Sequence, residues 1–84
     1  MSEIQVSIIG FAQLKTLFSQ SSHEFTFPEG ATVQQLKQAV WEQYPEQDHL
    51  LKTCLIATST EYLSDQTPLI QGQEYAWIPP VSGG

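Results

Sequence analysis

The sequence predicts an α+β protein in which one long helix packs across one face of a mixed sheet. Two hydrophobic periods support this prediction. A period of two, typical of strands, occurs twice in the first third of the chain, and a helical period follows in the middle. We expect the last strand to pair with the first. The 84 residues allow one small domain with a thin core.

The first third of the chain predicts two strands joined through a short helix. Apolar and polar residues alternate through positions 4–8, which indicates a strand with one buried face. After Gly10, four apolar side chains recur at helical spacing: Phe11, Leu14, Leu17 and Phe18. Positions 24–27 alternate again, and Pro28 ends this second strand.

The strongest local signal is a helix from about Thr32 to Tyr44. Thr32 is a good N-cap, and Gln35 stands three residues later, at the position that completes a capping box. Apolar residues at steps of three and four define one buried face: Val33, Leu36, Val40 and Tyr44. Pro45 ends the helix because the residue before a proline is pushed out of the helical region.

The segment after this helix predicts shorter elements. Residues 46–52 form a polar linker with some helical character. Residues 54–57 are a short apolar run, expected to be a strand that is buried on both faces. A brief edge strand is expected at residues 61–63.

The last part of the chain predicts a turn-rich connection and a final strand. The connection, residues 65–72, carries two side chains that we expect in the core, Leu69 and Ile70. Residues 74–78 are the final strand. Pro79 and Pro80 end regular pairing since neither offers an N–H.

The charge balance restricts the possible partners. Three lysines and no arginine stand against nine acidic residues, so the net charge is −6. Nucleic acid and anionic membranes are therefore not expected as partners, and a basic protein surface is favoured. The alternative is that the charge only maintains solubility. No apolar run approaches the roughly 18 residues of a membrane helix, and a lone cysteine without an export signal predicts a cytoplasmic protein.

The body of the domain offers weak candidates for chemistry. Glu42 and Glu46 are four residues apart, but Pro45 separates them and both are expected in solvent. The only soft metal ligands lack zinc-type spacing, so no metal is expected: His23, His49 and Cys54. Cys54 begins an apolar run and is interpreted as a small core residue rather than a reactive thiol.

The C-terminus offers a different chemistry. Gly83 and Gly84 form the narrowest possible peptide and could thread a tight channel in another protein. A carboxylate is a poor acyl donor, so any reaction at Gly84 must begin with activation, such as transfer of AMP from ATP. The alternative interpretation is a frayed terminus without function.

Several sequence blocks together resemble the small, sulfur-carrying subunit of molybdopterin synthase, the MoaD-type carriers. The blocks cover essentially the whole chain: residues 11–14 (FAQL), 28–33 (PEGATV) with Leu36, 61–69 (EYLSDQTPL), Gly72 before Glu74, and 78–84 (IPPVSGG). The chain departs from the family pattern at Ser59, Gln73 and Trp77, and the pattern of the C-terminal end is unaffected.

The resemblance implies a β-grasp, ubiquitin-like fold over residues 1–80, with a sheet of four to five strands and a flexible tail over residues 81–84. It implies that an ATP-dependent activating enzyme adenylates Gly84 and converts it to a thiocarboxylate. The tail then donates sulfur to cyclic pyranopterin monophosphate in the large synthase subunit, which holds the catalytic groups. This chain itself would bind no cofactor.

The resemblance also implies a contact surface for the large subunit and assembly into a heterotetramer. Three apolar residues match it by position: Phe11, Tyr62 and Ile78. Four residues would follow them into the partner, with Gly83 as the slim approach to the reacting residue: Pro79, Pro80, Val81 and Ser82. The alternative is that Phe11 and Ile78 belong to the core. Aromatic residues beside an exposed edge are typical of interface hot spots.

Two other functions remain possible from the sequence. One is a related sulfur carrier for the thiamine thiazole or another sulfur-containing metabolite. The other is a ubiquitin-like protein modifier or a pure interaction module. The proline pair before the glycine pair favours the molybdopterin carrier.

Overall fold

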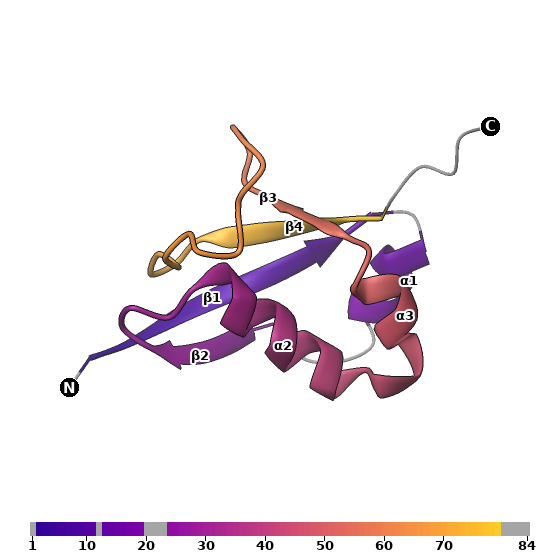
Figure 1. Cartoon of the computed structure of the whole chain (residues 1–84), viewed down its shortest axis with the longest axis horizontal. Coiled ribbons are helices and arrows are strands. Elements are labelled where there is room, and N and C mark those ends of the chain that lie inside the picture. The colour runs from indigo at the N-terminus through magenta and orange to yellow at the C-terminus, as the bar shows by residue number, and fades with distance from the viewer. Residues whose placement is uncertain (1, 12, 20–23, 80–84) are drawn as a thin grey trace.

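The computed structural model describes residues 2–11, 13–19 and 24–79, which form one sheet and its covering helices (Figure 1). The elements follow in the order β1 (Glu3–Gly10), α1 (Gln13–Ser19), β2 (Glu24–Pro28), α2 (Val33–Gln43), the 3-10 turn η1 (Pro45–Gln47), α3 (Asp48–Leu51), β3 (Leu55–Ala57) and β4 (Glu74–Ile78). This order confirms the α+β prediction and the single main helix, α2. The predicted tail, residues 81–84, lies outside the described residues.

The four strands form a mixed sheet in the order β2-β1-β4-β3. The central strand β1 pairs antiparallel with β2 and parallel with β4, where Ser7 lies beside Glu74 and Gly10 beside Trp77. The parallel pair confirms that the last strand joins the first. Strand β3 pairs antiparallel with β4 and forms the other edge.

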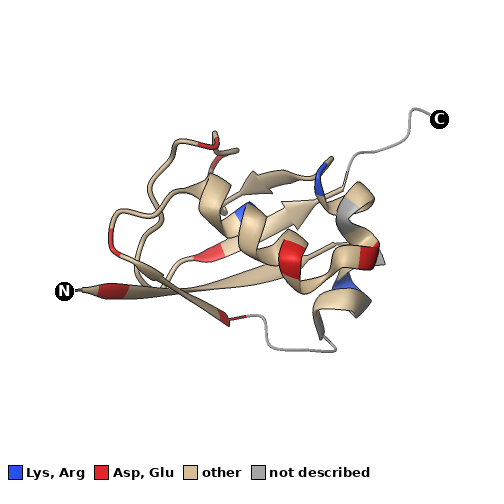
Figure 2. Cartoon of the chain, turned by 60° about the horizontal axis from the view of Figure 1, so that its bottom comes forward, with Lys and Arg blue, Asp and Glu red and all other residues tan. Residues whose placement is uncertain are grey.

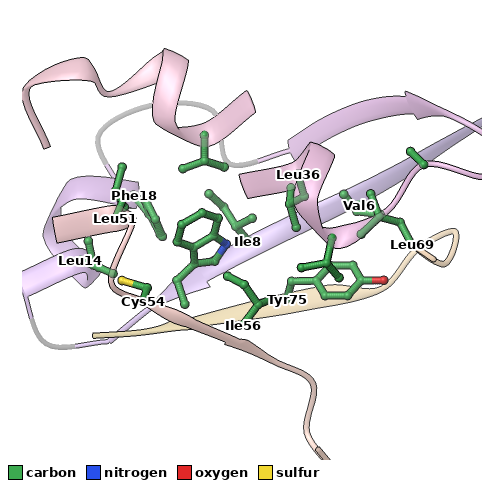
Figure 3. Packing of buried hydrophobic residues seen from close by; sticks show 14 of the residues in the cluster. Val6, Ile8, Leu14, Phe18, Leu36, Leu51, Cys54, Ile56, Leu69 and Tyr75 are labelled. Carbon is green, nitrogen blue, oxygen red and sulfur yellow. The ribbon is translucent and has the colours of Figure 1, made fainter. Parts of the chain in front are cut away.

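The core lies between α2 and one face of the sheet, called here the inner face (Figure 3). The inner face consists of buried side chains of β1, β3 and β4, with the partly buried phenylalanines of β2 packed beside them: Ile4, Val6, Ile8, Phe25, Phe27, Ile56, Tyr75 and Trp77. The three helix residues predicted to be buried, Val33, Leu36 and Val40, are fully enclosed. This confirms the phase of the predicted helix.

The N-terminus of α2 is held by the loop that precedes β4. The first two N–H groups of the helix donate to that loop: Val33 to the Thr67 carbonyl at 2.9 Å and Gln34 to the Asp65 carbonyl at 3.0 Å. Lys37 Nζ also donates to Asp65 Oδ1 at 2.8 Å. The two backbone hydrogen bonds satisfy N–H groups that have no partner inside the helix itself.

The structure corrects three expectations about the second half of the chain. Leu55 is 54% exposed, whereas the next two residues of the edge strand β3, Ile56 and Ala57, are buried. The predicted strand at residues 61–63 is a single bridge between Tyr62 and Ala57. Ile70 is 62% exposed, while Leu69 alone enters the core. In the described part of the chain, no helix has the length and apolar character needed to cross a membrane.

Candidate functional site: an apolar surface at the end of β4

The face of the sheet opposite α2, called here the outer face, carries an apolar surface at one end. We define this apolar surface by six residues from five segments: Ile9, Phe11, Leu55, Tyr62, Ala76 and Ile78. Four of the five exposed large apolar side chains in the described ranges belong to it. Contiguous exposed apolar residues are typical of protein interaction sites.

The strand register brings these residues together. Ile9 of β1 lies beside Ala76 of β4, which in turn faces Ala57 of β3. The next row pairs Ile78 with Leu55. Because neighbours in adjacent strands point to the same side, all of these side chains lie on the outer face.

Phe11 reaches this surface because the chain bends sharply after β1. A Cβ atom on Gly10 would lie 2.7 Å from Leu14 Cβ, so only glycine lets α1 approach the strand this closely. The Leu14 N–H donates to the Phe11 carbonyl at 3.1 Å, which fixes this bend. Leu14 and Phe18 enter the core, and Phe11 remains 49% exposed outside the helix.

A groove of about 370 Å³ crosses the apolar surface. Its apolar part is lined by Ile9, Phe11, Ala76 and Ile78, and its other end by polar residues: Thr58, Ser59, Gln73 and Glu74. Tyr62 stands next to this groove through its bridge to Ala57 and is 66% exposed. The groove therefore joins an apolar end, beside the end of β4, to a polar end at the start of β4.

The structure brings together the three residues predicted as an interface. Phe11 and Ile78 line one groove, and Tyr62 stands beside it. Pro79 follows Ile78 and is half-buried. The other predicted site residues lie outside the described ranges: Pro80, Val81, Ser82, Gly83 and Gly84.

Sequence reasoning missed Ile9, Leu55 and Ala76. The first of them could have been found, because Ile9 breaks the series of polar residues at the outward positions of β1. The prediction for Leu55 is wrong because a four-residue apolar run does not reveal which of its faces is covered.

The candidates inside the domain are structural or solvated. Cys54 is buried and packs in the core, which confirms its predicted place. Burial raises the pKa of the Cys54 thiol from 9.0 to about 11, partly offset by the nearby Lys37 charge. Glu42, Glu46 and His49 are exposed, while His23 lies outside the described residues. Within the described ranges, no three His, Cys, Asp or Glu residues gather as a metal site.

The arrangement of sheet and helix defines the class of protein as a β-grasp, ubiquitin-like fold, and solved structures confirm it. A Caldiarchaeum subterraneum ubiquitin matches with a TM-score of 0.68 and 17% identity, over 99% of this chain and 100% of that chain. A chain of a protein–protein complex of subunits 1 and 2 of the molybdopterin-converting factor from Helicobacter pylori has a TM-score of 0.63 and 23% identity, over 96% of this chain and 100% of that chain.

Sequence comparison defines the family more narrowly. The model of the ThiS family matches residues 8–84. A molybdopterin synthase sulfur carrier subunit from Chlamydomonas reinhardtii is 31% identical over 83 residues, which cover 96% of this chain and all of that protein. The chain belongs to the ThiS family, and within it to the molybdopterin synthase sulfur carrier subunits.

Proposed function

We propose that this chain carries sulfur as a thiocarboxylate on Gly84 and docks on the large subunit of molybdopterin synthase through the apolar surface. Its family membership makes it a sulfur carrier subunit in molybdenum cofactor biosynthesis. The observation that supports the finer proposal is the place of Ile78, which belongs to the apolar surface and is the last residue of β4. Gly84 is the sixth residue after Ile78, so the two are at most about 20 Å apart along the chain.

The proposed loading of sulfur takes two steps. The Gly84 carboxylate first attacks the α-phosphorus of ATP on an activating enzyme, which forms an acyl-adenylate and releases pyrophosphate. A sulfide equivalent from that enzyme's sulfur donor then attacks the acyl carbon. AMP leaves with the electron pair of the broken C–O bond, and a thiocarboxylate remains. ATP is thus bound by the activating enzyme, and this chain holds no cofactor of its own.

The proposed delivery step returns the carrier to its starting form. The thiocarboxylate sulfur forms a C–S bond to a side-chain carbon of cyclic pyranopterin monophosphate, and an oxygen substituent of that carbon leaves with its electron pair. Water then attacks the acyl carbon of the resulting thioester. The acyl C–S bond breaks, the sulfur stays on the pterin and the Gly84 carboxylate is restored. Each carrier delivers one sulfur atom, so two loaded carriers are needed for the two sulfurs of the dithiolene. The groups that polarise the pterin and move protons belong to the large subunit.

The proposed assembly is a cytoplasmic heterotetramer with two copies of each subunit. The similar structure from Helicobacter pylori is a protein–protein complex of subunits 1 and 2 of the molybdopterin-converting factor. We assign the apolar surface as this chain's contact in the assembly. Apolar anchors in a desolvated groove contribute most of the binding free energy of typical interfaces.

The test is molybdopterin formation from a chemically prepared thiocarboxylate of this chain, a purified large subunit and cyclic pyranopterin monophosphate. One glycine added after Gly84 moves the reacting carbon by about 3.5 Å and should abolish sulfur transfer without changing stability. The control is Cys54→Ser, which keeps the terminus unchanged and should retain transfer. Full activity of the extended chain, or loss of activity in a folded Cys54→Ser variant, would overturn the proposal.

A further inference from the structure

We infer that Glu74 recruits a basic side chain of the partner, so that the partner's contact face combines an apolar patch with a lysine or arginine beside it. This inference rests on the proposed function in one respect, the identity of the partner as the large subunit. It concerns the polar end of the groove, where the apolar residues of the surface give way to charge.

The register places Glu74 on the outer face, next to the apolar surface. Glu74, Ala76 and Ile78 alternate along β4 and point to the same side, and all three line the groove. Across the sheet, Glu74 lies beside Ser7 of β1, which also faces Glu24 of β2. Two acidic residues therefore flank Ser7 in one row, directly next to the row that contains Ile9 and Ala76.

The positive charges of the described residues lie elsewhere. Lys15 is on α1, Lys37 is on α2 and pairs with Asp65, and Lys52 follows α3 (Figure 2). None of them is on a strand of the sheet. Among the described residues, the Glu74 carboxylate has no hydrogen bond or ion pair, so its charge gives this part of the outer face a negative potential.

A charge at the rim of an apolar contact acts mainly on the encounter. It attracts a partner of opposite charge and orients it before the apolar side chains meet, which raises the association rate. A partner with a like charge at that position would be rejected. The net charge of −6 attracts basic partners from any direction, whereas Glu74 selects one orientation on the groove.

The experiment measures association of the purified large subunit with the full chain at low salt and near 1 M salt. Glu74→Lys and the control Glu29→Lys both change the net charge from −6 to −4. Glu29 is exposed in the turn after β2, the edge strand farthest from β3. At low salt, Glu74→Lys should associate about tenfold more slowly than Glu29→Lys. The difference should nearly vanish at 1 M salt, where the screening length is about 3 Å.

Two further variants keep the outcomes distinct. Glu74→Gln removes the charge without reversing it and should slow association by about threefold, in a protein whose circular dichroism matches the parent chain. Equal association rates for Glu74→Lys and Glu29→Lys would overturn the inference. If Phe11→Asp still weakens binding in that case, the docking proposal stands and only the role of Glu74 fails. If Phe11→Asp also leaves binding unchanged, the docking proposal fails as well.

Discussion

At the scale of single residues, Gly10 determines where the apolar surface begins. It ends β1 on the inner side of the sheet, beside Trp77, and leaves no room for a side chain because Leu14 fills that space. The chain therefore turns immediately, α1 packs under the sheet and Phe11 remains outside. The absence of a Cβ atom at Gly10 thus lets α1 pack in the core while Phe11 stays exposed.

Replacing Gly10 with alanine should destabilise the fold. The new methyl group would lie 2.7 Å from Leu14 Cβ and 2.8 Å from the Leu14 carbonyl oxygen, so backbone must move. Overpacking of this kind costs about 1–3 kcal/mol in the free energy of unfolding. Urea unfolding of Gly10→Ala measures it, and Ser7→Ala on the outer face of the same strand is the control, expected within about 0.5 kcal/mol of the parent. Equal stability of Gly10→Ala and the parent chain would contradict the argument.

The buried Cys54 thiol makes the fold lose stability at alkaline pH. Its pKa is about 11 in the folded chain against 9.0 for a solvated thiol. Above pH 9 the unfolded chain therefore loses a proton that the folded chain retains, and stability falls as the pH rises from about 9 to 11. Urea unfolding at pH 8 and pH 10 should show this loss in the parent chain and a smaller loss in Cys54→Ala. Identical losses in both proteins would show that the thiol is not the cause.

At the scale of elements, α2 illustrates what sequence can predict. Its start, end and buried face all follow from local signals, because the capping residues, the apolar period and Pro45 act within a few residues of one another. The strand at β3 was predicted, but the exposure of Leu55 on it, and the reduction of the strand expected at residues 61–63 to a bridge at Tyr62, could not be predicted in this way. Their exposure depends on which faces the distant helices cover.

In the candidate site, too, some residues could be predicted from the sequence and others depend on tertiary structure. Phe11, Tyr62 and Ile78 were found through family resemblance, and each lies at an element boundary or outside the regular elements. Leu55 belongs to the same surface but was assigned to the core, because the register of β3 against β4 is a long-range property. The place of Leu55 in the site therefore depends on tertiary structure and could not be predicted from local sequence.

The capping box of α2 should contribute measurably to stability. Gln35 Oε1 accepts a hydrogen bond from the Thr32 N–H at 3.0 Å. Gln35→Ala leaves that donor without its partner and should cost about 0.5–1 kcal/mol, even though alanine is the better helix former. Thermal unfolding should show the loss. Gln38→Ala, on an exposed turn of the same helix, should be neutral or slightly stabilising; a loss of equal size there would show that the capping hydrogen bond of Gln35 is not the cause.

At the scale of the whole molecule, the two faces of the sheet have separate roles. The inner face holds the buried side chains that stabilise the domain, and the outer face carries the apolar surface and its acidic neighbour, Glu74. The period of two in each strand makes this separation possible, because alternate residues serve different faces. Substitutions on the outer face can therefore change binding while the fold persists.

Phe11→Asp should weaken binding to the large subunit by about 2 kcal/mol or more, a loss of roughly 30-fold in affinity. Its urea unfolding should remain close to that of the parent chain because the side chain is half exposed. Ile70→Asp is the matched control, since Ile70 is an exposed apolar residue outside the apolar surface. Titration calorimetry measures both affinities. Unfolding of the Phe11 variant would place its side chain in the core, and equal losses in both variants would remove the special role of the surface.

The parallel pairing of β1 with β4 has a consequence for synthesis of the chain. The centre of the sheet joins residues near the two ends of the sequence, so a nascent chain that stops before Glu74 lacks the neighbour of both β1 and β3. Such a fragment exposes the apolar side chains that Tyr75 and Trp77 would cover, and cellular proteases remove unfolded chains of this kind. A chain that stops before Glu74 therefore lacks both the strand that joins the two halves of the sheet and the outer-face residues Ala76 and Ile78, so we expect it neither to fold stably nor to form the groove.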